Sequence, residues 1–222
     1  MNNIPNGPTN GPGPRKGRDF IARHGETVFN AARRLQGEAA HTPLTRAGFA
    51  QADEMGAALA GFLGEKPSLT LWSSSMGRAL QTLAVVTEHL GLDWHDTHHD
   101  DRLVEIGMGC WGGRYYADVM AEFGTIIEPG TGLLLPAPDG ETYPQIATRV
   151  SDWLAETHDD PGDRLIIMHG ISSRVLRGVM TGADVHPVLG APTLPPLPQG
   201  SMVMIAGGVE TLVHRGTGHA PA

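Results

Sequence analysis

The stretch Phe20-Ile21-Ala22-Arg23-His24-Gly25-Glu26-Thr27 decides the fold of this chain. Three apolar residues run directly into a polar loop, which is typical of a buried strand that ends at a functional edge of a sheet. Two more apolar runs, at 68–72 and 164–168, lead into polar segments that begin at Ser73 and His169. In an open α/β sheet the carboxyl ends of the strands lie together, so we expect these three loops to meet.

Helical patterns separate these strands along the chain. Predicted helices cover residues 45–62, 77–90, 116–123, 141–158 and 172–180, with Thr45 as an N-cap. A short strand is expected near Trp94, and a closing hairpin at 201–206 and 210–213. Strands that alternate with helices predict an α/β fold, a three-layer α/β/α sandwich with a mainly parallel central sheet.

The length suits one domain, since the chain has 222 residues and 40% of them are hydrophobic. Residues 1–17 are mostly Asn, Gly, Pro and Thr, and we expect a disordered tail there. The folded domain is expected at 18–215, with an irregular, lid-like segment at about 106–140. Residues 216–222 are expected to form a flexible C-terminal tail.

Composition argues against several classes of protein. The formal net charge of −8 does not favour a nucleic-acid-binding surface. No apolar run reaches the roughly 18 residues of a membrane helix, and the N-terminus lacks the apolar region of a signal peptide. Cys110 is the single cysteine, so no disulfide can form within the chain. We therefore expect a cytoplasmic protein with no nucleic-acid or membrane partner.

The three loops carry groups that suit a phosphate. They hold the imidazoles of His24 and His169, the guanidinium groups of Arg23 and Arg78, and a helix N-terminus after Gly170. Guanidinium forks give paired, directional donors to phosphate oxygens, and a helix N-terminus favours negative charge. The sequence therefore predicts a local anion site on an acidic protein.

The same loops form an ordered set of motifs. In chain order these are Arg-His-Gly-Glu-Thr at 23–27 with Asn30, Arg-Leu-Gln-Gly at 34–37, Pro-Leu-Thr at 43–45, Ser-Ser at 73–74 with Arg78, Leu-Val-Glu at 103–105, Gly-Glu-Thr at 140–142 and His-Gly at 169–170. Together they resemble the histidine phosphatase superfamily, in the branch that includes cofactor-dependent phosphoglycerate mutases. The resemblance runs from about Arg18 to Val213 and implies a phosphoglycerate mutase-like fold.

The resemblance also implies a role for each central residue. His24 would be the nucleophile, and Arg23, Arg78 and His169 would surround the oxygens of the transferred phosphoryl group. An imidazole nitrogen attacks only when it carries no proton. We therefore expect the other nitrogen of His24 to donate to a fixed acceptor, such as a backbone carbonyl.

Glu105 is the residue that the resemblance implies as proton donor. It would protonate the leaving oxygen and later activate water. For the first step it must begin protonated, and Glu26 is a candidate neighbouring carboxylate. The alternative is a loop carboxylate that pairs with Arg102 or Arg114.

The remaining candidates would contact phosphate or substrate. Asn30 and the backbone N–H of Gly170 would bind phosphate, although Asn30 also fits an ordinary polar position in a helix. Arg34, Gln36 and Gly37 would line the substrate entrance, and solvated side chains are the alternative for Arg34 and Gln36.

Three functions fit these motifs. A phosphatase and a mutase would share the phosphohistidine, whereas a non-catalytic phosphate-binding module would be expected to lack His24 or Glu105. The stretch 111–140 has one basic residue, Arg114, and Trp111-Gly112-Gly113 resembles the phosphatase branch. We therefore expect a metal-independent phosphomonoester hydrolase without a cofactor, acting on a small phosphorylated substrate. The variety of assemblies in the family leaves a homodimer open.

Two further features lie outside this scheme. The cluster His95, Asp96, His98, His99, Asp100 and Asp101 permits a metal site, but we expect an exposed polar turn after a short strand, and the family chemistry needs no metal. Leu133-Leu134-Leu135 and the Pro-rich run at 192–198 are expected to form an apolar rim of the pocket or an oligomer contact.

Overall fold

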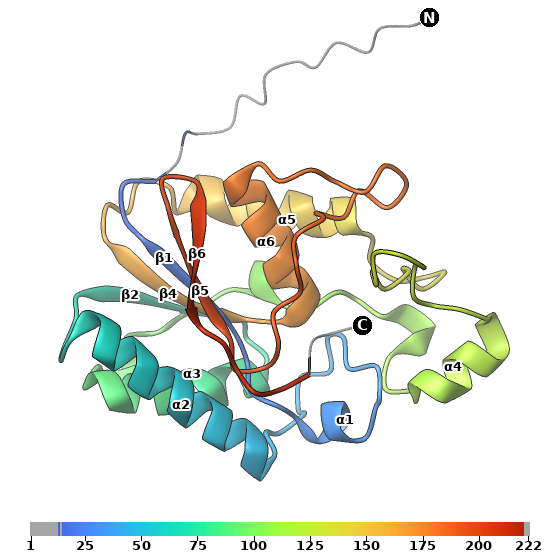
Figure 1. Ribbon diagram of the computed structural model, residues 1–222, viewed down its shortest axis with the longest axis horizontal. Coiled ribbons are helices and arrows are strands. Elements are labelled where there is room, and N and C mark those ends of the chain that lie inside the picture. Colours follow the sequence, from blue (N-terminus) through green and yellow to red (C-terminus); the bar gives the residue numbers. More distant parts are fainter. Residues whose placement is uncertain (1–12, 14, 220–222) are drawn as a thin grey trace, which may run out of the picture.

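The computed structural model describes residue 13 and residues 15–219. Its centre is a six-stranded sheet in the order β3-β2-β4-β1-β5-β6 (Figure 1). Strands β3, β2, β4 and β1 run parallel, β5 runs antiparallel to β1, and β6 runs antiparallel to β5. The strands are β1 (Asp19–Arg23), β2 (Leu69–Ser73), β3 (His98–His99), β4 (Asp163–Met168), β5 (Met202–Ala206) and β6 (Val209–His214). The predicted mainly parallel sheet is therefore confirmed.

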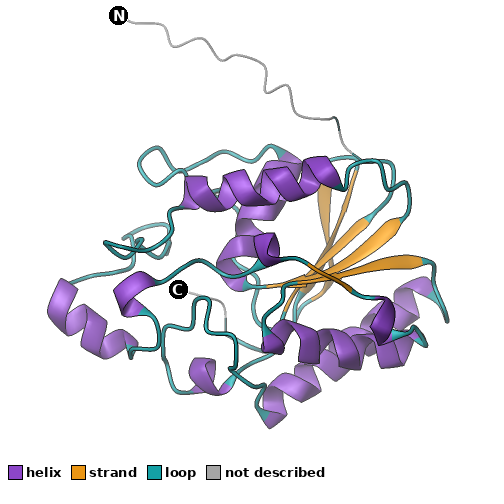
Figure 2. Cartoon of the chain, turned by 180° about the vertical axis from the view of Figure 1, so that it is seen from behind, coloured by secondary structure: helices purple, strands orange, loops and turns teal. Residues whose placement is uncertain are grey.

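Helices cover both faces of this sheet (Figure 2). They are α1 (Val28–Ala31), α2 (Arg46–Leu63), α3 (Gly77–Leu90), α4 (Tyr116–Phe123), α5 (Tyr143–Glu156) and α6 (Gly170–Thr181). Helices α2 and α3 pack on one face, and α5 and α6 pack on the other. This arrangement confirms the predicted three-layer sandwich. Helix α4 lies apart from the sheet, at the right of Figure 1.

The residues of β1 show how the two cores form on the two faces. Phe20 and Ala22 join the core under α2 and α3, where they meet Met55. Ile21 joins the core under α5 and α6, together with Trp153. Successive side chains of a strand point to opposite faces, so one short apolar run supplies both cores.

The region around Trp94 differs from the expected strand. Trp94 opens a 3₁₀ turn, Trp94–Asp96, because the carboxylate of Asp93 accepts the N–H of His95 and caps it. The strand comes later, at His98–His99, where it pairs with the end of β2. Local side-chain capping has therefore moved the strand beyond the expected place.

The expected N-terminal tail lies mostly outside the described residues. Within them, Arg15 is buried and donates to the carboxylate of Asp19 at 2.6 Å. Arg164 donates to the same carboxylate oxygen, also at 2.6 Å. Packed structure therefore begins before the expected boundary at residue 18. Across the described part of the chain, no helix combines the length and the apolar character needed to cross a bilayer.

Candidate active site

The three predicted loops meet at one edge of the sheet. Strands β2, β4 and β1 are neighbours and run parallel, so their carboxyl ends lie side by side. The loop after β1 carries His24, the loop after β2 leads to Arg78, and His169 follows β4. The ring centroids of His24 and His169 lie 5.1 Å apart. Sheet topology therefore brings together residues that are distant in sequence.

The hydrogen bonds of His24 fix which ring nitrogen carries the proton. Its Nδ1 lies 2.7 Å from the carbonyl oxygen of Gly25, which can only accept, so Nδ1 donates. Its Nε2 faces the Nε–H of Arg78 at 3.3 Å and must accept. Burial, followed by the positive charges of Arg78 and Arg23, lowers the pKa of His24 well below its usual value. At neutral pH the ring is therefore neutral, with a bare Nε2.

Arg78 is fully buried and connects the two histidines to the loop before α2. Its guanidinium donates to His24 Nε2 at 3.3 Å, His169 Nδ1 at 3.1 Å, the Ala39 carbonyl at 2.8 Å, Thr42 Oγ1 at 3.1 Å and the Gly37 carbonyl at 2.6 Å. Burial lowers its pKa to about 10, against the opposing effect of Glu105. Arg78 therefore stays charged at neutral pH and holds its place rigidly.

His169 is held from its other side by Ser74. The ring Nε2 lies 2.7 Å from Ser74 Oγ. Because Nδ1 accepts from Arg78, a neutral ring donates its Nε2–H to this hydroxyl. Burial, with the charge of Arg78 next, lowers the pKa of His169 well below its usual value. Ser74 therefore fixes the orientation of the second imidazole.

Arg23 completes the cationic side of the site. It is buried, and burial lowers its pKa to about 10 while the charge of Glu105 opposes the change. One terminal nitrogen donates to the carbonyls of Leu197 at 2.8 Å and His219 at 2.9 Å. Its Nε is buried and has no hydrogen-bond partner within the part of the chain that the structure describes.

Glu105 lies at the start of α6. Its carboxylate accepts the N–H groups of Ile171 at 3.1 Å and Ser172 at 2.9 Å. It also accepts the N–H of Ile106, the next residue in the chain, at 3.1 Å. His169, the residue before α6, makes no side-chain cap, so Glu105 supplies the acceptors for the helix start. This tertiary cap explains why α6 begins at Gly170, earlier than the expected residue 172.

The expected neighbours of Glu105 are occupied elsewhere. Arg102 pairs with Asp100 and Glu156, and Arg114 pairs with Glu122. The alternative in which Glu105 pairs with Arg102 or Arg114 is therefore wrong.

Glu26 also has another partner. Its carboxylate accepts the hydroxyl of Thr45 at 2.6 Å, where Thr45 caps α2 as predicted. No contact joins Glu26 to Glu105 among the described hydrogen bonds.

A cavity of about 420 Å³ opens against His24. Its walls are Arg23, His24, Asn30, Arg33, Arg34, Gln36, Gly37, Glu105, Met108, Tyr116, Met120, Ile171, Gln199 and His219. Arg78, His169 and Gly170 are not among the residues that line it, and Arg78 and His169 instead contact His24. Of the predicted central residues, Arg23, His24 and Glu105 therefore face the space that a substrate would enter.

The remaining predicted residues mostly support this wall through contacts with the protein. The Asn30 side chain accepts from Thr27 at the start of α1, and Gln36 Oε1 lies 2.5 Å from the Thr27 hydroxyl. Arg34 donates its Nε to the Gly113 carbonyl at 2.6 Å. These side chains line the cavity and also join the segments that surround it.

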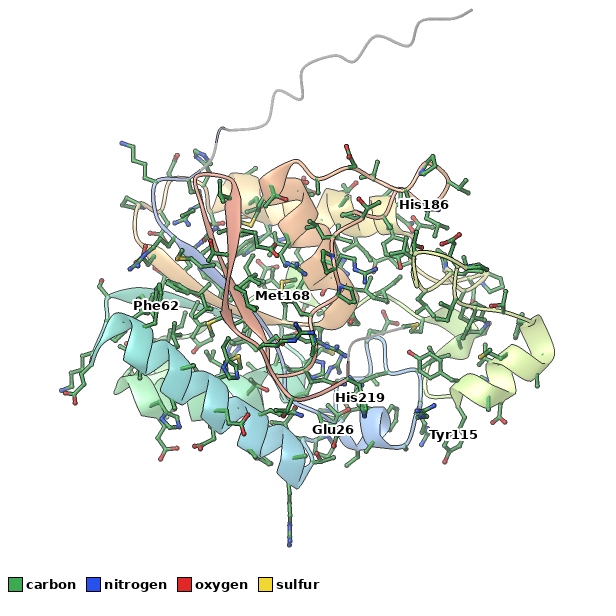
Figure 3. The ribbon with its side chains drawn as sticks, viewed as in Figure 1. Glu26, Phe62, Tyr115, Met168, His186 and His219 are labelled. Atoms are coloured by element: carbon green, nitrogen blue, oxygen red, sulfur yellow. The ribbon has the colours of Figure 1, made fainter. Side chains whose placement is uncertain are left out.

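The structure adds residues that the sequence did not indicate. Tyr116 stands at the start of α4, and burial raises its pKa, so the phenol stays neutral. Gln199 and His219 come from the C-terminal part of the chain, and in Figure 3 His219 lies in the same region below the sheet as Glu26. The aromatic character of Tyr116 within the lid-like segment was a weak sign that it could line the cavity. Nothing in the sequence of the expected flexible tail at 216–222 indicated that His219 would line the cavity. Residues 220–222 lie outside the described chain.

The expected apolar rim is wrong. Leu133 and Leu134 are 1% and 2% exposed and belong to the core under α5 and α6. None of Leu133, Leu134 or the run at 192–198 lines the cavity. Apolar character at the cavity comes instead from Met108, Met120 and Ile171.

The histidine and aspartate cluster near β3 is dispersed among other contacts. Asp100 binds Arg102, Asp101 accepts from Ser75, and His98 stacks on Trp72 with ring centroids 4.8 Å apart. Among the described residues, no three His, Cys, Asp or Glu side chains are grouped so that they could hold a metal ion.

The comparisons with known proteins agree on a family. The model of the histidine phosphatase superfamily (branch 1) matches residues 20–193. The probable phosphoglycerate mutase GpmB of Enterobacter sp. (strain 638) is 33% identical over 174 residues, which cover 75% of this chain and 76% of that protein. The protein of the same name from Citrobacter koseri is 33% identical over 170 residues, 73% of this chain and 74% of that one.

Solved structures support the same assignment. A mycobacterial glucosyl-3-phosphoglycerate phosphatase in complex with VO3 has a TM-score of 0.68 at 25% identity, covering 88% of this chain and 96% of that one. The alpha-ribazole phosphatase from Shigella flexneri shares the fold, with a TM-score of 0.67 at 24% identity over 92% of this chain and 98% of that one. The matched proteins thus include named phosphatases and named mutases. The chain therefore belongs to the histidine phosphatase superfamily, branch 1.

Proposed function

We propose that this protein is a phosphomonoester hydrolase that works through a phosphohistidine at His24. One observation carries the proposal: Nε2 of His24 is the unprotonated nitrogen of a neutral, buried ring, which is held by the Gly25 carbonyl and lies beside the charge of Arg78. Such a nitrogen is a nucleophile ready for attack, and the nearby cations offset the charge of the phosphoryl oxygens.

In the first step, Nε2 of His24 attacks phosphorus and the bond to the ester oxygen breaks. Glu105 gives its proton to the leaving oxygen, and the alcohol departs. In the second step Glu105 acts as a general base instead of a general acid. Its carboxylate takes a proton from water, the water oxygen attacks phosphorus, and the P–N bond breaks to release phosphate. Glu105 lines the cavity with His24, which suits both steps.

The state of the lid-like segment favours a phosphatase over a mutase. A mutase must hold a second anionic group and keep water out. The one basic residue of this segment, Arg114, pairs with Glu122 at 2.6 Å. Arg34 donates to the Gly113 carbonyl and packs on the rings of Phe29 and Tyr115, at 4.5 and 5.2 Å from their centroids. Among the described residues, the arginines that line the cavity are then Arg23, Arg33 and Arg34, and none of them comes from the lid-like segment.

Mutase activity is the second candidate, because the relatives at 33% identity carry that name. Phosphate release and isomerisation can be measured on the same sample of 3-phosphoglycerate. Release that exceeds isomerisation supports the phosphatase, and isomerisation that exceeds release overturns it.

The central test is to trap the phosphoenzyme. Wild-type protein is mixed with ³²P-labelled phosphomonoester in EDTA, denatured at alkaline pH to preserve phosphohistidine, and digested for mass spectrometry. We expect phosphate on His24, nitrophenyl phosphate turnover that survives EDTA, and loss of both signals in His24→Asn. Turnover without label on His24, or binding without turnover, would contradict the proposal.

A further inference from the structure

We infer that Glu141 and Arg149 are positioning residues that hold Glu105 where it can transfer its proton. The inference rests on the proposed function, because it gives these residues a role in the work of Glu105. Neither residue lines the cavity, so each would act through the loop that carries Glu105.

Glu141 forms two hydrogen bonds with this loop at Gly107, two residues after Glu105. Its backbone N–H donates to the Gly107 carbonyl at 2.8 Å, and its side-chain Oε2 accepts the Gly107 N–H at 3.1 Å. Both hydrogen-bonding groups of one loop residue are therefore taken by a single partner. Such a pair fixes the loop in position and in rotation about its axis.

Arg149 joins Glu141 to the other side of the same loop. It holds the carboxylate of Glu141 with two nitrogens, Nε at 2.7 Å and a terminal nitrogen at 3.0 Å. Its remaining donors reach the carbonyl of Arg102 at 2.5 Å and, in a longer contact of 3.4 Å, the carbonyl of Glu105 itself. The loop from 102 to 107 is thus held before, at and after Glu105.

Partial burial strengthens the ion pair between Arg149 and Glu141. The side chains of Arg149 and Glu141 are 17% and 20% exposed, unlike the outer Arg114–Glu122 pair at 33% and 56%. A two-point guanidinium–carboxylate contact has defined geometry as well as charge, and shielding from water strengthens it. A general acid loses much of its effect when it is displaced by about 1 Å, so a loose loop would weaken proton transfer first.

The test uses two substrates that differ in their need for a proton. Nitrophenolate leaves without one, whereas an alkoxide does not. We expect Arg149→Gln to lower kcat/KM for an alkyl phosphate about 50-fold and for nitrophenyl phosphate less than about 5-fold, since only the first depends on the position of Glu105. Glu141→Gln keeps an acceptor for Gly107 but loses the ion pair, and should change the ratio in the same direction. Glu122→Gln is the matched control and should leave both rates unchanged.

Two comparisons separate positioning from mere stability. Arg149→Lys keeps the charge and should restore part of the ratio, and Glu105→Gln should change the ratio little further in an Arg149→Gln background. Equal losses for both substrates, or additive effects of Glu105→Gln and Arg149→Gln, would overturn the inference. If wild-type protein never carries phosphate on His24, the proposed function fails. If it does and the ratio stays constant, only the inference fails.

Discussion

Arg78 directs its Nε–H at the Nε2 atom of His24, 3.3 Å away. A guanidinium in this position cannot protonate the imidazole, yet it places a positive charge beside the atom that would attack phosphorus. The other nitrogens of Arg78 are tied to the carbonyls of Ala39 and Gly37. The attacking atom and its counter-charge are therefore held in a fixed relation by the backbone.

We predict that Arg78→Lys lowers kcat/KM for nitrophenyl phosphate about 100- to 1,000-fold, the effect of removing a preorganised stabilising group. A lysine carries the charge but has no planar fork to reach two rings and two carbonyls together. Steady-state kinetics would measure this, with the exposed Arg46→Lys as a control that should keep wild-type rates. An Arg78→Lys enzyme with more than half of the wild-type activity would exclude the proposed role.

The neutral histidines predict how stability depends on pH. The folded-state pKa values of His24 and His169 lie well below 6.5, whereas the unfolded chain has ordinary histidines. Below about pH 6.5 the unfolded state binds more protons, so stability falls on acidification, by up to about 1.4 kcal/mol per pH unit for each histidine. Above about pH 6.5 both states leave these histidines neutral, so stability no longer depends on their protonation. Urea unfolding between pH 7.5 and 5.0 should show a shallower fall for His24→Asn than for wild type. Parallel curves would show that His24 has the same pKa in the folded and the unfolded protein, which would contradict the neutral buried ring.

The fold could be predicted because its signals are local. The apolar run at 20–22 and the helical pattern after Thr45 depend on neighbouring residues, and both reappear as β1 and α2. The start of α6 could not be placed, because its acceptors come from Glu105, 66 residues before Ile171. A cap supplied by a distant loop leaves no trace in the local pattern.

The site was predictable where residues follow strand ends. His24, Arg78 and His169 converge because sheet order brings their strands together. Gln199 and His219 reach the cavity through irregular segments, for which no periodicity exists. Leu133 and Leu134 were misassigned because an apolar run in a loop region fits a pocket rim and a core equally well, and packing against α5 decides between them.

Ser74 provides a prediction about the second histidine. Ser74→Ala removes the hydroxyl 2.7 Å from His169 Nε2 and leaves a buried ring nitrogen without a partner. We expect a loss of stability of about 1–3 kcal/mol, and a roughly tenfold fall in kcat/KM as the ring loses its orientation. The neighbouring Ser73→Ala is the control, since that buried hydroxyl donates to the Ser74 carbonyl at 2.8 Å and makes no hydrogen bond to either histidine among the described residues. Equal activity losses in both variants would show a general packing effect.

Gly37 links backbone conformation to the position of Arg78. Its φ is +50°, its carbonyl accepts from Arg78 at 2.6 Å, and an added Cβ would lie 2.5 Å from Cγ of Met108. Gly37→Ala must therefore strain the backbone and push this loop or Met108 away, which shifts the acceptor of Arg78. We expect about 1–3 kcal/mol of lost stability and a roughly tenfold fall in kcat/KM. Gly182→Ala, with φ at +65° and open space around the new Cβ, carries a similar backbone cost and should keep full activity. Thermal unfolding and steady-state kinetics should be measured on both variants. An activity loss in Gly182→Ala as large as that in Gly37→Ala would show that the loss does not depend on the Gly37–Arg78 contact.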